Sequence, residues 1–240
     1  MATLNAAVTS AAKEATERLK GYLDSSKTRD EAIVLLVKNL IEENKNVLFS
    51  GDNYSKKWLE EAANRGLPKI EKCSDAIEVM RDSNATKFLV DATVLTSDEI
   101  ISRVNISLNR YVTTKSIEMQ TLSEMINIFV VPAVEKQLHQ SHSVLVNARA
   151  TKLQDSLSGR VAKLESILNS LIVGQNDLEE CLDKVEELDT DENKMNLLDN
   201  VASFLTTKLR ESADSAESII ADEFWSLPKY RDLLFHGSMN

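Results

Sequence analysis

The sequence predicts a mainly α-helical protein whose long antiparallel helices form a bundle-like C-terminal extension, with at most one short strand near residues 46–50. The composition supports this fold class, because 42% of the residues are hydrophobic and 28% are charged, with only six glycines and three prolines. Such values are typical of soluble helical proteins. Apolar residues also recur at spacings of three and four, which places them on one helix face. Finally, Thr28 with Glu31 and Thr96 with Glu99 match the capping box that begins many helices.

The amino-terminal part predicts several separate helices. An apolar stripe over residues 4–19 predicts the first helix, which Gly21 would loosen or end. The capping box at Thr28 begins the second helix, whose apolar face is formed by Ile33, Leu36, Val37, Leu40 and Ile41. Farther along, a smaller helix is expected from Ser74, and a looser connection is expected over residues 83–93.

The stretch "NVLFSGDNYSKKW" predicts a turn that leads into another helix. Residues 47–49 form a short apolar run that ends at Gly51, which suits a brief extended segment. The helix that follows has a cap near Ser55 and carries Trp58 inward. Because Gly66 is a typical helix C-terminal residue, we expect this helix to stop there.

From Thr96 onward the apolar pattern predicts longer helices. Helical spacing continues to Val130, and Pro132 then removes one backbone donor and crowds the preceding turn. A kink or a break is therefore expected at Pro132. Another long helix is expected from Val144 to Ile172, ended by Gly174.

Two further helices are expected over the apolar stripes at residues 178–188 and 195–220. These patterns predict three parts: helices and the GDNYS joint over 1–95, a long-helix bundle over 96–223, and an aromatic docking tail over 224–240. A coiled-coil rod is the second possible fold. It is disfavoured because the stripes lack a sustained heptad with charged e and g positions.

The charge excludes several classes of partner. A net charge of −10 and no basic stripe argue against nucleic acid, because affinity for a phosphate backbone depends on lysine and arginine. Anionic membrane surfaces are disfavoured for the same reason. No apolar run reaches the length of a membrane span, and the amino end lacks the apolar core of an export signal. Cys73 and Cys181 lie far apart, so reduced thiols in the cytoplasm are expected.

A search for catalytic motifs finds no phosphate-binding GxxxxGK loop, GxGxxG turn, GxSxG elbow or HExxH helix. Asp189, Asp191 and Asn193 imitate the opening of a calcium loop. However, Lys194 occupies the position that needs glycine, and Asn200 the position that needs a bidentate glutamate. A polar loop between helices is therefore favoured over a calcium site.

Two other weak candidates remain. His139 and His142 lie one helical turn apart, but no cysteine or carboxylate set accompanies them, which favours a solvated pair over a zinc site. Gly51 and the polar residues that follow it could cradle an anion at a helix start. A structural joint is favoured, because one glycine is a weak phosphate signal. No catalytic, cofactor-binding or metal-binding residue is therefore assigned.

The aromatic residues gather at the carboxy-terminal end, in "FWSLPKYRDLLF" at residues 224–235, although only 5% of the chain is aromatic. Such residues bury a large area while a polar tip keeps one hydrogen bond. We therefore expect a docking tail anchored by Trp225. The candidate docking residues are Trp58, Trp225, Pro228, Tyr230, Leu233, Leu234 and Phe235.

Three blocks of the sequence, in the same order, resemble the large type III glutamine synthetases. The terminal block resembles the family's carboxy-terminal ending through Trp225, Pro228, Tyr230, Asp232, Leu233, Leu234 and Phe235. The block "FSGDNYSKKWLEEAANRGLP" matches through Phe49, Gly51, Asp52, Tyr54, Ser55, Trp58, Glu61, Ala62, Arg65, Gly66, Leu67 and Pro68. The middle block "SIEMQTLSEMINIFVVPAV" matches through Glu118, Met125, Pro132, Ala133 and Val134. The resemblance covers residues 40–236, with departures at Asn53, Val131, Leu227 and Arg231.

The resemblance implies a helical C-terminal region of an enzyme that joins ammonia to glutamate using ATP and Mg or Mn. In that family the metal and nucleotide sites lie in a catalytic core, which is expected to precede Met1, so none of its catalytic residues transfers to this sequence. The implied role is structural, with the catalytic domain and subunits of glutamine synthetase as partners in a homo-oligomer. Whether this chain is itself an active enzyme is left open. Without the catalytic core, the isolated chain is expected to be inactive.

Two alternatives come from other classes. The chain could be an independent helical adaptor that binds a partner protein through exposed apolar stripes. It could also be a complete small enzyme, which the absence of catalytic motifs disfavours.

Overall fold

The computed structural model describes residues 2–25, 28–148 and 153–235, and within these ranges all regular structure is helical and no strand occurs. The predicted mainly α fold class is confirmed. Residues 48–50, near the one expected strand, are irregular. Contacts divide the chain into unit 1, residues 1–107, and unit 2, residues 108–240, so the boundary falls within helix α6 (Ser97–Met125). The division at residues 95 and 223 stays a prediction.

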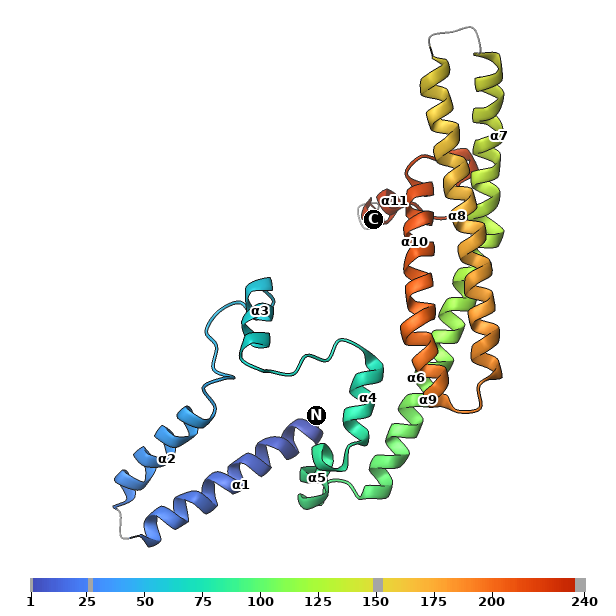
Figure 1. The fold of residues 1–240 in the computed structure, drawn as a ribbon. Coiled ribbons are helices and arrows are strands. Elements are labelled where there is room, and N and C mark those ends of the chain that lie inside the picture. Colours follow the sequence, from blue (N-terminus) through green and yellow to red (C-terminus); the bar gives the residue numbers. More distant parts are fainter. Residues whose placement is uncertain (1, 26–27, 149–152, 236–240) are drawn as a thin grey trace. The chain divides into compact units, whose positions relative to one another are not determined.

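Unit 1 begins with an antiparallel pair of helices, α1 (Ala2–Asp24) and α2 (Arg29–Glu43) (Figure 1). The capping box predicted at Thr28 is present, with Thr28 and Glu31 each accepting from the other's backbone N–H. Arg18 joins the two helices, since its guanidinium lies 2.6 Å from a carboxylate oxygen of Glu43. Gly21 does not end α1, which continues to Asp24 because one glycine in a helix costs only about 1 kcal/mol.

Three short helices follow in unit 1: α3 (Lys56–Asn64), α4 (Cys73–Arg81) and α5 (Ser83–Asp91). The prediction of a looser connection over residues 83–93 was wrong, because α5 covers most of this segment. Asp82 caps this helix by accepting a hydrogen bond from the N–H of Asn84 at 2.9 Å, and Leu89 is fully buried. The cap and the buried leucine stabilise a helix whose sequence contains poor helix formers.

In unit 2, α6 continues through a π-helical segment at Ile126–Val130 into α7 (Val131–Asn147). Pro132 lies at the start of α7, and the helical path does not break there, so the alternative of a break was wrong. The wider π turn, in which the N–H of Val131 donates to the carbonyl of Ile126, precedes the proline. A π turn re-routes the hydrogen bonds next to a residue that cannot donate one.

Two predicted helix boundaries in unit 2 were also wrong. α7 ends at Asn147 and α8 (Gln154–Glu187) is a separate helix, so no single helix runs from Val144 to Ile172. Gly174 does not end a helix either, since α8 passes through it. A Cβ atom at this position would lie 3.1 Å from Cδ1 of Leu209. The glycine therefore allows α10 (Ser203–Glu217) to approach α8 closely.

α8 packs against both α7 and α10, which places it at the centre of unit 2 (Figure 1). Before α10 lie α9 (Asp191–Leu197) and a second π-helical segment, Leu198–Ala202. After α10 come a short 3₁₀ turn, Asp222–Phe224, and α11 (Tyr230–Phe235). The largest fully buried side chains of this unit are Ile126, Val134, Leu164, Leu171, Leu178, Met195, Leu198 and Leu209. These residues form a continuous helical core.

Replacing Gly174 by leucine should lower the free energy of unfolding by about 1–3 kcal/mol, because the new side chain overpacks the contact with Leu209. Gly159 offers a matched control on the same helix, since a Cβ atom there meets no other group within 4 Å. G159L should leave stability unchanged or raise it. Urea unfolding followed by circular dichroism measures both, and equal stabilities for G174L and G159L would contradict the packing role.

Candidate functional site

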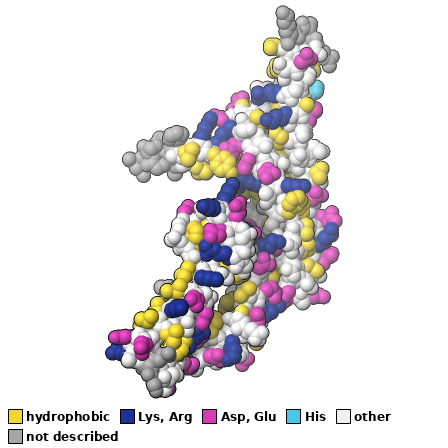
Figure 2. Space-filling view, turned by 60° about the vertical axis from the view of Figure 1, so that its left-hand side comes forward, with side chains coloured by type: hydrophobic (Ala, Val, Ile, Leu, Met, Phe, Trp, Pro, Cys, Tyr) yellow, Lys and Arg dark blue, Asp and Glu magenta, His cyan; other side chains and the backbone are white. Residues whose placement is uncertain are grey.

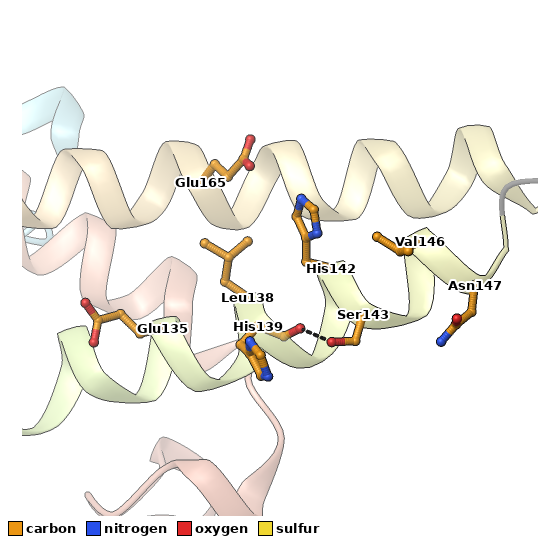
Figure 3. Close-up of a pocket in the computed structure, with 8 residues that line it drawn as sticks. All are labelled: Glu135, Leu138, His139, His142, Ser143, Val146, Asn147 and Glu165. Atoms are coloured by element: carbon orange, nitrogen blue, oxygen red, sulfur yellow. Dashed lines mark hydrogen bonds between the residues drawn. The ribbon is translucent and has the colours of Figure 1, made fainter.

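The weak metal-site candidates do not form a metal site in the described part of the structure. His139 and His142 both belong to α7, and Figure 3 shows that their imidazole rings point in different directions, with His142 on the side of α8. Asp191 lies at the start of α9, where Thr190 caps the helix. Within the residues that the structure describes, no group of three His, Cys, Asp or Glu side chains is arranged to hold a metal ion.

The GDNYS stretch of unit 1 forms a tight turn before α3. Asp52 accepts a hydrogen bond from the N–H of Tyr54 at 2.9 Å, and Ser55 caps α3 through the N–H of Trp58. A Cβ atom on Gly51 would lie only 2.7 Å from the ring of Phe49, so a larger residue here would require the ring to shift. The polar groups of the turn are thus used to start the helix.

The aromatic rings of Phe49 and Trp58 stack beside this turn, with centroids 4.1 Å apart. Arg65 lies over the Trp58 ring at 5.4 Å and pairs with Glu61. Its guanidinium also donates to two backbone carbonyls before the turn, that of Asn46 at 3.1 Å and that of Leu48 at 2.9 Å. We call Phe49, Trp58, Glu61 and Arg65 the aromatic joint. It holds irregular backbone against a short helix.

The outer face of α2 exposes an apolar stripe, formed by Ile33, Val34, Val37 and Ile41, which are 39%, 68%, 48% and 54% exposed. Figure 2 shows hydrophobic side chains lying along the α1–α2 pair. The sequence placed Ile33, Val37 and Ile41 on one apolar face of this helix. In the structure that face is turned to solvent within unit 1.

In unit 2, Trp225 is half-buried and lines an apolar pocket with residues of α10 and of the end of α6. Tyr230 lies against α10, where its hydroxyl contacts Arg210 and its backbone N–H donates to Glu217 at 2.8 Å. The start of the tail therefore contacts its own unit.

The remaining docking candidates differ in exposure. Leu233 and Leu234 are 62% and 81% exposed, and Pro228 is exposed at the rim of the pocket. The side chain of Phe235 lies outside the described residues. That this tail and Trp58 dock onto a further body stays a prediction.

Asp222 fixes the tail electrostatically. Its carboxylate accepts from Lys229 at 2.8 Å and also pairs with Arg231, while Lys229 donates to the carbonyl of Ile220 at 2.9 Å. The hydrogen bond from Lys229, and then that from Arg231, lower the pKa of Asp222. Sequence reasoning assigned no structural role to Asp222, Arg210 or Arg65. The one available signal was a charged residue one turn from an aromatic or from an opposite charge.

R65A should loosen the aromatic joint, because the substitution removes two hydrogen bonds to backbone carbonyls and the ion pair with Glu61. We expect hydrogen exchange over residues 46–66 to become faster by about ten- to a hundredfold, which corresponds to about 1.5–3 kcal/mol for charged hydrogen bonds. K57A, an exposed change on the same helix, is the control. Equal exchange in the two variants would contradict this role of Arg65.

Acidification should detach the tail. Because the pKa of Asp222 is lowered in the folded state, its stabilising contribution is fully present above the ordinary value of 3.8 and is lost as the pH falls through the lower folded value. Hydrogen exchange over residues 225–235, compared between pH 6 and pH values below about 4, should show this loss. In D222N, the amides of the tail should be unprotected at every pH, whereas in E223Q their protection should equal that in the unchanged chain. A tail that is equally protected in D222N would contradict the assignment.

The helices described above include none that is both long and apolar enough to be a membrane-span candidate.

Comparison with known proteins finds that the chain is similar to glutamine synthetases. The model of the glutamine synthetase C-terminal domain matches residues 32–149. The chain is 25% identical to a glutamine synthetase of Bacteroides fragilis over 98% of its own length, and 28% identical to one of Butyrivibrio fibrisolvens over 85%. It is 23% identical to a type-3 glutamine synthetase of Dictyostelium discoideum over 87%.

The chain spans about a third of the length of these relatives, namely 33%, 30% and 29%. The resemblance that the three sequence blocks carry is thereby confirmed. Residues 32–149 match the C-terminal domain of glutamine synthetases, and the chain is similar to these enzymes over most of its length.

Proposed function

We propose that the chain is the structural, non-catalytic C-terminal part of a type III glutamine synthetase. It covers part of the catalytic domain and supports contacts between the subunits of a homo-oligomer in the cytoplasm. Joining ammonia to glutamate, with ATP and Mg or Mn, is the work of the part of the enzyme that this chain does not match. The chain itself binds neither the nucleotide nor the metal.

The observation that carries this proposal is the apolar stripe on α2. Four aliphatic side chains at helical spacing face solvent within unit 1, and three of them belong to the apolar face that the sequence predicts. Full burial of such a side chain contributes about 1.5–3 kcal/mol, so covering the stripe is favourable. The stripe also falls inside the segment that matches the family.

The electrostatics of the stripe fit a protein surface as its cover. Lys38 and Glu42 border it, and both are exposed. An apolar centre with a polar rim is the usual construction of a protein–protein interface.

The test exchanges the matched region of the Bacteroides fragilis enzyme for this chain. We expect the chimera to assemble as its parent does and to form glutamine. V34S/I41S removes apolar surface from the stripe and should weaken assembly by at least about tenfold, as the loss of about 1.4 kcal/mol or more implies. K38S introduces the same residue beside the stripe and should leave assembly unchanged. Light scattering after size exclusion measures the assembly.

Two results would contradict the proposal. One is a V34S/I41S chimera that assembles as well as K38S. The other is glutamate-dependent ATP turnover by the chain alone in the presence of Mg²⁺, since this would place catalytic groups within its own residues.

A further inference from the structure

Unit 2 contains an apolar pocket of about 250 Å³ beneath the C-terminal segment. One wall is formed by Met125 and Ile126 at the junction of α6 with the π-helical segment, and a second by Ala213 of α10. Trp225 and Leu227 close it from the side of the tail. A water molecule takes about 30 Å³ in the liquid, so the pocket has room for about eight groups of that size.

The charged groups at the rim are already paired within the protein. Arg210 contacts the hydroxyl of Tyr230 and donates to Asp214 at 3.0 Å. Glu217 accepts from the backbone N–H of Tyr230 at 2.8 Å. A charged ligand would have to displace one of these partners or enter an apolar space uncompensated, and both are unfavourable. The pocket therefore selects for neutral molecules.

One polar atom of a lining residue, Trp225, has no hydrogen-bond partner. The indole Nε1 of Trp225 is covered from solvent and has no hydrogen-bond partner. A buried donor without an acceptor costs about 1–3 kcal/mol, so an acceptor brought by a ligand would recover part of that free energy. Because the tail is short and held mainly by Asp222 and Tyr230, a small shift of Trp225 toward a ligand needs no change in the helical core.

We propose that this pocket binds a small, neutral, largely apolar molecule that carries one hydrogen-bond acceptor, such as an aromatic ketone. The apolar body lies against Met125, Ile126 and Ala213, and the acceptor oxygen takes the N–H of Trp225. This site lies wholly in unit 2. It is independent of the proposed interface on α2 and of any catalytic role.

The test uses acetophenone, with α-methylstyrene as a probe of the same shape that has a methylene group in place of the ketone oxygen. The full-length chain carries W58F, so that Trp225 supplies the single indole N–H signal. In ¹H–¹⁵N spectra, acetophenone should shift this signal downfield and saturate with a Kd of about 0.1–1 mM. It should bind about five- to tenfold more tightly than α-methylstyrene, since one recovered hydrogen bond contributes about 1 kcal/mol.

Two variants of α10 distinguish binding in the pocket from binding on the helix surface. A213L fills the pocket and should abolish the shift, whereas S215L adds the same side chain at an exposed position and should bind normally. The amide spectrum of each variant reports whether it is folded. If A213L is unfolded, M125F is used instead, because its larger side chain fills the pocket from the opposite wall.

Three outcomes would overturn the inference. The first is the absence of a saturable shift with acetophenone at concentrations up to about ten times the expected Kd. The second is equal affinity for the two probes, which would remove the role of the Trp225 N–H. The third is unchanged binding in the folded pocket-filling variant, which would place the probe elsewhere.

Discussion

The close contact between α8 and α10 is the constraint on which the rest of unit 2 depends. Gly174 lets the Leu209 side chain lie against the backbone of α8, and this contact sets the distance between the two helices. Arg210, Asp214 and Glu217 follow Leu209 along α10, so the same contact places the groups that hold Tyr230. A larger residue at position 174 would have to displace the Leu209 side chain, and packed interiors transmit such shifts.

The sequence determined the fold class and most helix starts, since capping residues and apolar periodicity act locally. Thr28, Ser55 and Thr96 accept the hydrogen bonds that their patterns predict. The sequence did not reveal α5 or the continuity of α8, because both depend on contacts between elements distant in sequence. A glycine that ends a helix and one that admits a neighbouring side chain look alike in a sequence, and the difference is the nearby Leu209.

The π-helical segments show another limit of periodicity. Ile126 and Val130 are both buried, as are Leu198 and Ala202, and each pair is four residues apart. A stripe of this spacing is equally compatible with an unbroken α-helix, so the pattern cannot reveal the wider turn. The aromatic residues of the candidate sites could be named from their clustering. Their charged partners Arg65 and Asp222 could not, because their roles depend on backbone carbonyls and on the return path of the tail.

The two kinds of apolar surface on this chain call for different explanations. The stripe on α2 lies on one helix face and consists of aliphatic side chains, so an apolar protein surface of complementary shape can cover it. The pocket in unit 2 is concave, has its rim charges paired, and contains one buried donor without an acceptor. A flat surface could cover the mouth of that pocket but could not reach the indole N–H of Trp225. Shape and hydrogen bonding therefore favour a protein partner for the stripe and a small molecule for the pocket, although both are apolar.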